Sequence, residues 1–250
     1  MSENFSISKF VMLSLLTVHF LGIINVTAQD NEFDNPEEKE RSIGITGGVG
    51  ASSSIIRKDT HSSSLRHGSA ATFFLGVNYR NQLTKKLTFS VLAEFRQNAY
   101  TATHSRTQND YTYHSKRMFN FLSLPVALDY LLTDNDKFST FAGAGIAGQY
   151  LLNSMIQYEY RFNSGETDYF RIFHSGSEYS RFSDNPFEKR LVFTGEVHYG
   201  VKWKLPDKQF IISQLRYLHD IDGMTNYFYS GRNPLIFHSL SLSIGYFKTF

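Results

Sequence analysis

The chain has 250 residues, a net charge of +2 at pH 7, 16% aromatic residues and no cysteine. The nearly balanced charge gives no reason to expect a nucleic-acid partner. The lack of cysteine excludes disulfides, thiolate metal sites and the lipidated cysteine of a bacterial lipoprotein.

The N-terminal residues predict a secretory signal peptide over residues 1–28. Lys9 gives a basic start, the apolar run FVMLSLLTVHFLGII (Phe10–Ile24) follows, and VTA (Val26–Ala28) offers small residues for cleavage after Ala28. A retained membrane anchor is the alternative, but the run is shorter than the ~20 residues that a spanning helix needs. Residues 29–41 are charged and aperiodic, and we expect them to form a periplasmic linker.

From Ser42 to Phe250, apolar residues recur at every second position, the pattern of β-strands with two chemically different faces. In chain order we expect eight strands, near residues 43–51, 71–80, 87–96, 122–130, 138–152, 191–204, 210–221 and 239–250. One face of each strand carries large apolar residues. The other carries glycine, serine, threonine and scattered charges.

The connections between these strands alternate between short and long. The short ones lie near Leu83–Lys86, Thr133–Lys137 and Leu205–Gln209, and the long ones near Ile56–Gly68, Thr101–Lys116, Asn153–Lys189 and Asp222–Leu235. An up-and-down antiparallel sheet with short turns at one edge and long loops at the other has this order.

The two faces predict a transmembrane β-barrel over residues 42–250. The interior of an eight-stranded barrel is only wide enough to be filled by side chains, so we expect the large apolar residues outside, against lipid, and small or charged ones inside. An aromatic girdle at the short-turn edge would contain Tyr79, Tyr130, Phe138, Trp203, Phe210, Tyr246 and Phe250. The stretch Met155–His174 reads as a hairpin that protrudes beyond the membrane, and a ten-stranded barrel is the alternative.

The last strand, SLSLSIGYFKTF, should pair with the first, because an open sheet edge in hydrocarbon leaves backbone groups unsatisfied. It also resembles the C-terminal signal that outer-membrane assembly machinery recognises, which makes that machinery an expected partner. Lys248 departs from the usual apolar residue, and at the interface a lysine can snorkel.

The segment FLSLPVALDY (Phe121–Tyr130) resembles the apolar-proline-apolar motif in the fourth strand of PorT-like outer-membrane β-barrel proteins of Gram-negative bacteria. The resemblance implies an outer-membrane location and a role in a secretion apparatus, and it carries no catalytic residues. Pro125 removes one donor from the strand pairing, so we expect a bulge or bend there.

Charged residues on the inner face predict a buried network, since opposite charges in a narrow interior must satisfy one another. Its members are Arg80, Glu94, Arg96, Glu196, His198, Lys202 and Arg216. Glu196 and His198 share a face and could in principle form an acid/base pair.

Other motifs favour no catalytic, cofactor or metal site. Gly143, Gly145 and Gly148 match the dinucleotide pattern G-x-G-x-x-G, but a strand rather than a helix follows them. His238 invites comparison with lipid-modifying hydrolases of the outer membrane, yet Ser239 and Ser241 should point to the opposite face. The histidines fall mostly in loops, without the spacing of a metal site.

The third long loop is rich in aromatic residues and arginines, the composition of contact surfaces. Its candidate contact residues are Tyr158, Tyr160, Phe162, Arg171, Phe173 and Arg181. We therefore expect a plugged barrel that acts as a structural or interaction component, surrounded by membrane lipid and lipopolysaccharide, with a partner at residues 153–189. A lipid-modifying enzyme, a small porin and a secretion component are the alternatives.

Overall fold

A computed structural model describes residues 40–56, 65–105, 111–162, 164–175, 191–222, 224–226 and 233–250. The chain divides into two units, Met1–Lys39 and Glu40–Phe250, and every described residue belongs to the second. The predicted signal peptide and most of the predicted linker lie outside the described residues.

No helix in the described part of the chain is long and apolar enough to cross a membrane.

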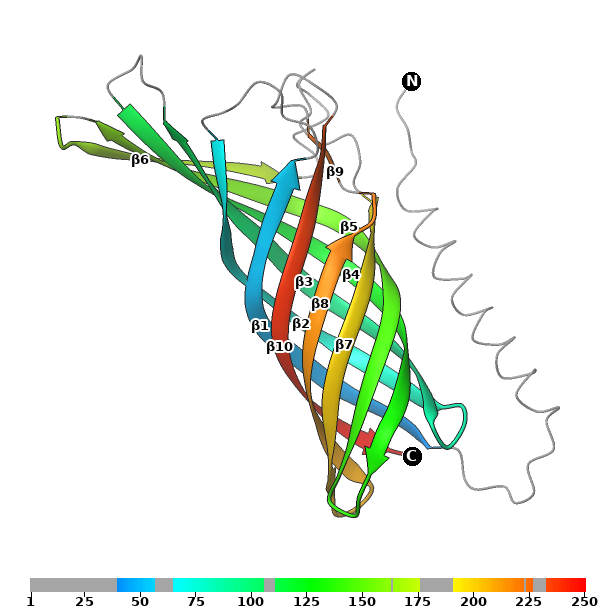
Figure 1. Cartoon of the computed structure of the whole chain (residues 1–250). Helices are drawn as coiled ribbons and strands as arrows, with labels where there is room; N and C mark the ends of the chain where they lie inside the picture. Colours follow the sequence, from blue (N-terminus) through cyan, green and yellow to red (C-terminus); the bar gives the residue numbers. More distant parts are fainter. Residues whose placement is uncertain are drawn as a thin grey trace. The chain divides into compact units, whose positions relative to one another are not determined.

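Eight antiparallel strands close into a barrel, as the sequence predicted (Figure 1). They are β1 (Arg41–Ile56), β2 (Leu65–Gln82), β3 (Leu87–Ser105), β4 (Tyr111–Asp134), β5 (Phe138–Phe162), β7 (Leu191–Leu205), β8 (Gln209–Asp220) and β10 (Asn233–Thr249). β1 pairs with β10 from Ser42–Thr249 to Ile56–Leu235, which closes the sheet. A short strand, β9 (Met224–Asn226), pairs with the start of β10.

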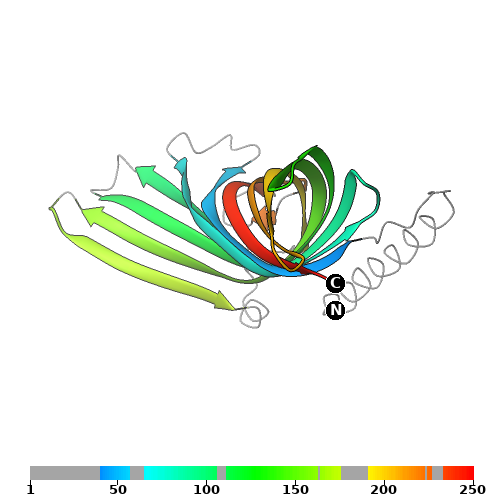
Figure 2. The ribbon, with the colours of Figure 1, turned by 90° about the horizontal axis from the view of Figure 1, so that it is seen from below.

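Part of the sheet continues beyond the barrel as a structure that we call the wing. It consists of β6 (Thr167–Ser175) with residues 101–105 of β3, 111–116 of β4 and 157–162 of β5. Figures 1 and 2 show the wing spreading sideways from one side of the barrel at the long-loop end. The predicted hairpin within Met155–His174 is thereby confirmed as β5 and β6.

The predicted loop Thr101–Lys116 is largely strand, because β3 continues to Ser105 and β4 begins at Tyr111. The expectation of a loop there was wrong for a physical reason. Outside the barrel the sheet no longer separates lipid from a packed interior, so its side chains lose the strong alternation while the backbone ladder continues.

The opposite end of the barrel has short turns at the three predicted places. In the turn between β7 and β8, Asp207 and Lys208 have φ angles of 59° and 57°, and the amide of Gln209 donates to the carbonyl of Pro206 at 3.3 Å. Two successive residues in the left-handed region define a type I′ turn, whose twist matches that of the flanking strands.

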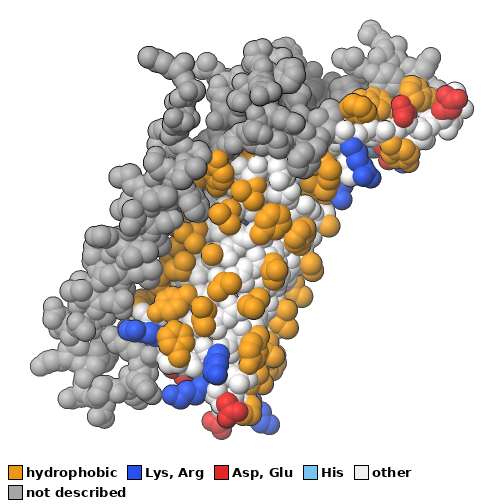
Figure 3. Space-filling model, turned by 180° about the vertical axis from the view of Figure 1, so that it is seen from behind, with side chains coloured by type: hydrophobic (Ala, Val, Ile, Leu, Met, Phe, Trp, Pro, Cys, Tyr) orange, Lys and Arg blue, Asp and Glu red, His pale blue; other side chains and the backbone are white. Residues whose placement is uncertain are grey.

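The barrel wall has the predicted apolar exterior (Figure 3). Val49 is 68% exposed and Leu242, its partner on β10, is 62% exposed, whereas Arg96 and Arg216 are almost completely buried inside. At the short-turn edge, Tyr130, Trp203, Tyr246 and Phe250 are exposed, as a girdle requires.

Phe210 does not belong to the girdle, contrary to the sequence-based expectation. It is 4% exposed and stacks on Phe247 inside the barrel, with ring centroids 5.0 Å apart. Phe210 lies six residues before the buried Arg216, so the period of two along β8 places both side chains on the inner face.

The interior is less polar than predicted. It holds an aromatic cluster near the short turns, which includes Phe141, Phe210 and Phe247, and a second cluster near the long loops. Glycines opposite these rings make the room. A Cβ atom on Gly200 would collide with the ring of Phe141, and one on Gly44 with the ring of Phe247.

Pro125 causes no bulge. The pairing of β3 with β4 skips Leu92 and Ala93, but its register is the same on both sides, from Val91–Val126 to Glu94–Ser123. The missing amide hydrogen of proline interrupts the ladder locally without shifting it.

Replacing Leu242 by arginine should destabilise the barrel by about 2–4 kcal/mol, because the charge would lie in the middle of the apolar band. The free energy of unfolding in lipid bilayers, measured by denaturant titration, checks this. Lys248→Arg is the matched control, since position 248 is on the same strand near the interface. Equal stability of Leu242→Arg and the control would contradict the assignment of this face to lipid.

Candidate functional site

The charged residues of the inner face form one connected network in the middle of the barrel. His198 on β7 contacts two carboxylates, with Nε2 2.6 Å from Oδ1 of Asp129 and Nδ1 3.0 Å from Oε1 of Glu196. Asp129 on β4 also forms an ion pair with Arg80 on β2 at 2.7 Å. Each of these four side chains is buried, so every charge depends on its protein partners rather than on water.

Arg216 on β8 continues the network across the lumen. Its guanidinium donates to both carboxylate oxygens of Glu196, at 3.0 and 2.8 Å, and to Glu94 on β3 at 3.0 Å. Because β3 and β8 are four positions apart in the closed order of eight strands, the contact with Glu94 spans the barrel. Glu94 in turn accepts a hydrogen bond from Nε of Arg96 at 2.8 Å.

The ring of Phe74 on β2 lies against both buried guanidiniums. The Cζ atom of Arg96 is 4.6 Å from the ring centroid and that of Arg216 is 4.5 Å from it. An aromatic face attracts a desolvated cation. Phe74 therefore adds to the stabilisation that the two arginines obtain from Glu94 and Glu196.

Of the seven residues predicted for this network, six are in it. Lys202 is not, because it lies nearer the short-turn mouth, where its Nζ contacts Glu40 at 3.1 Å. Sequence reasoning missed Asp129, although the signal was present. In the strand around Phe121–Tyr130, Leu128 and Tyr130 point outward, so the alternation places Asp129 inside.

Gly143 on β5 leaves room for the contact between His198 and Asp129, because glycine has no side chain. A Cβ atom at this position would collide with Nε2 of His198 and with Oδ1 of Asp129, the two atoms of the shortest contact in the network. Gly145, two residues on, faces the backbone of Val126 in the same way. The glycine pattern in this segment therefore serves the packing of the barrel wall, and it lies within a strand as expected.

An aromatic lid closes the lumen between the network and the long loops. Phe119 on β4 and Phe237 on β10 have ring centroids 5.1 Å apart, and Tyr100 on β3 packs against both rings at 6.1 and 5.9 Å. β4 and β10 are also four positions apart in the strand order, so this contact again spans the barrel. All three side chains are almost fully buried.

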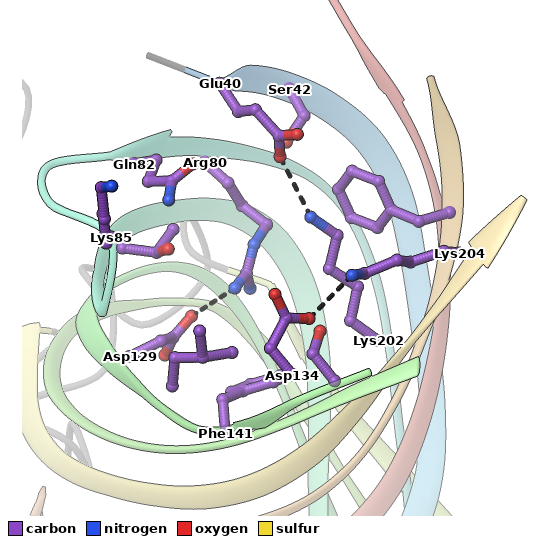
Figure 4. A pocket seen from close by; sticks show the side chains of 14 residues that line it. Glu40, Ser42, Arg80, Gln82, Lys85, Asp129, Asp134, Phe141, Lys202 and Lys204 are labelled. Atoms are coloured by element: carbon purple, nitrogen blue, oxygen red, sulfur yellow. Dashed lines mark hydrogen bonds and ion pairs between the residues drawn. The ribbon is translucent and has the colours of Figure 1, made fainter. Parts of the chain in front are cut away.

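A cavity of about 170 Å³ opens at the short-turn end (Figure 4). Two ion pairs lie at its mouth, Lys202 with Glu40 at 3.1 Å and Lys204 with Asp134 at 2.7 Å. Its lining reaches inward to Arg80 and Asp129, the first members of the network. The cavity is thus a vestibule that ends at the buried charges.

The arrangement offers little to catalysis. Glu196 and His198 do lie within hydrogen-bonding distance, but Glu196 also holds Arg216, and the second nitrogen of His198 contacts Asp129. Both groups are fully engaged in binding their neighbours. A substrate would have to break these contacts to reach either of them.

The comparison with a rim hydrolase also meets a geometric obstacle. His238 pairs with His219 on the outer side of the wall, whereas Ser239 and Ser241 are buried and face the interior. Within the described ranges, no group of three or more His, Asp or Glu side chains is placed to hold a metal ion.

The wing separates the predicted contact residues onto two faces. Tyr158, Tyr160 and Phe162 alternate along β5 on the face that continues the lumen side of the barrel, which we call the inner face. Arg171 pairs with Gln157 and lies on the opposite, outer face. Phe173 belongs to β6, but its side chain is outside the described part, as is the whole of Arg181.

Comparison with known families supports the fold. Residues 27–225 match the family model of the outer membrane protein beta-barrel domain. The chain belongs to this family. It is located in the outer membrane, where barrels place their short turns in the periplasm and their long loops outside. The vestibule therefore opens to the periplasm, and the wing lies outside the cell.

Several solved outer-membrane structures are similar to this chain. OprG from Pseudomonas aeruginosa is 13% identical, with 86% of this chain and 99% of that chain covered and a TM-score of 0.43. Ail from Yersinia pestis, bound to a heparin analogue, is 12% identical (83% and 99% covered, TM-score 0.35). The protease OmpT from Escherichia coli is 7% identical (88% and 99% covered, TM-score 0.46). No match was found among curated proteins.

Neutralising Glu196 should destabilise the folded barrel by about 3–5 kcal/mol, because Arg216 and His198 would each lose a buried partner. We expect Glu196→Gln and Glu94→Gln to lower the unfolding temperature of the purified protein in detergent, followed by heat-modifiable migration on gels. Glu159→Gln is the control, since Glu159 pairs with an exposed Arg161 and such pairs contribute about 0–1 kcal/mol. Unchanged unfolding of both network variants would refute the structural role of the network.

Proposed function

We propose that the protein is a non-conducting outer-membrane barrel that displays the wing outside the cell as a contact surface for another protein. The observation that carries the proposal is the pairing of a closed lumen with an exposed aromatic face. The apolar wall of the barrel holds the protein in the membrane, and the aromatic surface suited to binding another protein lies in the wing, outside the barrel.

The closed lumen argues against a pore. Two contacts cross it at different heights, that of Arg216 with Glu94 and that of Phe119 with Phe237. A permeating solute would have to separate both. Breaking the first leaves desolvated charges, which costs several kcal/mol, and the second is part of a packed aromatic cluster.

The inner face of the wing has the composition of a protein-binding surface. Tyr158 and Tyr160 stack with ring centroids 6.1 Å apart. Phe162 is 40% exposed, and Phe170, which pairs with Tyr158 on the neighbouring strand, is 56% exposed. Exposing large aromatic side chains to water is unfavourable, and covering them with a binding partner lowers the free energy. Such side chains are also enriched at protein interfaces.

The finer proposal concerns the partner. The resemblance of FLSLPVALDY (Phe121–Tyr130) to PorT-like proteins supports a component of a secretion apparatus as the protein that binds the wing. A strain that lacks this protein should then show an altered set of exported proteins.

Planar bilayers that contain the purified full chain should show no single-channel conductance steps, because the network and the aromatic lid both block the lumen. The double variant Phe119→Ala with Phe237→Ala removes two of the three rings of the lid, leaves the network intact and should stay closed there. Steady conductance of the unaltered protein would contradict the proposal and favour a small porin.

A photo-crosslinking residue at Phe170 should form an adduct with a protein in intact cells, since position 170 lies in the exposed aromatic face. We expect Phe162→Ser to reduce the adduct about tenfold, as the loss of an aromatic anchor does at interfaces. The same crosslinker at Leu242, on the lipid-facing wall, is the control.

A protein adduct of equal yield from position 242, or none from position 170, would count against the wing as the contact surface. If the adduct forms but the exported proteins of the deletion strain are unaltered, the secretion role alone fails.

A further inference from the structure

Three amide side chains form a ladder across the outer surface where the wing leaves the barrel. Nε2 of Gln97 on β3 donates to Oδ1 of Asn120 on β4 at 2.9 Å, and Nδ2 of Asn120 donates to Oδ1 of Asn153 on β5 at 2.6 Å. The ladder faces outward, because Gln97 and Asn120 each stand two residues beyond an exposed apolar residue, Phe95 and Leu122 respectively.

The amide ladder lies near a chemical boundary. Next to it on the barrel side, exposed apolar residues cover the wall, among them Phe95, Leu122 and Leu152, the extra residue of a bulge in β5. Amide groups that bond one another are poorly suited to hydrocarbon and well suited to the headgroup region. The ladder therefore lies close to the level at which the outer leaflet changes from acyl chains to headgroups.

Beyond the ladder, one further apolar pair, Met118 with Met155, stands before the same outer face becomes basic. Lys116, Gln157 and Arg171 are directly paired across β4, β5 and β6, so their side chains stand in one row. Within the described residues, neither Lys116 nor Arg171 takes part in an ion pair, and Arg171 is exposed. In the neighbouring rows, Arg161 is matched by Glu159 at 2.7 Å.

The wing turns this basic row toward the membrane. It bends away from the barrel axis and spreads sideways (Figures 1 and 2), so the face that continues the lipid-facing wall looks back toward the plane of the bilayer. Figure 3 shows basic side chains gathered along the lower edge of the wing, next to the upper end of the apolar band.

We infer that the outer face of the wing binds the phosphorylated headgroup of the outer-leaflet glycolipid, lipopolysaccharide. The surface is continuous with the wall that already contacts the acyl chains of that leaflet. Lys116 and Arg171 supply the charge that phosphates require, and Arg171 can donate two parallel hydrogen bonds to one phosphate. The amide ladder supplies donors and acceptors at the height of the sugars.

The test is a titration of the full chain in detergent with bisphosphorylated lipid A, followed by native mass spectrometry. Lys116→Ala with Arg171→Ala should weaken the apparent affinity about tenfold or more, since each basic group near an anionic lipid surface contributes to binding. Wild-type protein should show a similar loss when the lipid A is dephosphorylated. The exchanged pair Lys116→Arg with Arg171→Lys should restore most of the binding.

Lys86→Ala with Lys137→Ala is the matched control, because it removes two exposed lysines at the periplasmic end. All variants are first checked for heat-modifiable migration on gels, which shows that the barrel is folded. Lys116→Glu with Arg171→Glu serves as a second variant with a larger effect, because it reverses both charges. Equal lipid A binding by the wild type, the double alanine variant and the double glutamate variant would overturn the inference. Full displacement of lipid A by inorganic phosphate would also overturn it, because the site would then be one for free anions.

Discussion

The whole structure depends on the rule that a backbone hydrogen-bonding group in hydrocarbon must find its partner within the protein. A sheet obeys this rule only when its first and last strands meet, and here β1 and β10 pair over almost their full lengths. Closure with eight strands then sets the width of the lumen, and that width decides what the interior can contain. The apolar exterior and the filled interior both follow from this closure.

Within that narrow lumen, large and small residues complement one another. Arg216 reaches Glu94 across the barrel, and His198 reaches Asp129 only because Gly143 presents no side chain to them. Three arginines, Arg80, Arg96 and Arg216, contact three carboxylates, and His198 joins two of these carboxylates, Asp129 and Glu196. A barrel filled in this way suits a membrane anchor. The side chains available to bind other molecules lie in the wing, at its outer end.

At that outer end a single sheet serves two environments. Its inner face presents aromatic residues such as Phe170, and its outer face presents the amide ladder and the basic row. The two proposals concern different faces, so a partner protein on one and a glycolipid on the other would be compatible. Holding the wing against the headgroups would also fix the orientation in which its aromatic face meets a partner.

The sequence by itself determined the barrel, because the alternation of apolar and polar residues in strands such as Leu191–Leu205 predicts which side chains face lipid. It also placed six members of the network, since a charge on the inner face of a narrow barrel has nowhere else to go. Only the tertiary structure decided which charges pair, that Phe119 and Phe237 meet across the lumen, and that the expected loop Thr101–Lys116 is mostly sheet. These features depend on contacts between residues far apart in the chain, and local periodicity carries no record of such contacts.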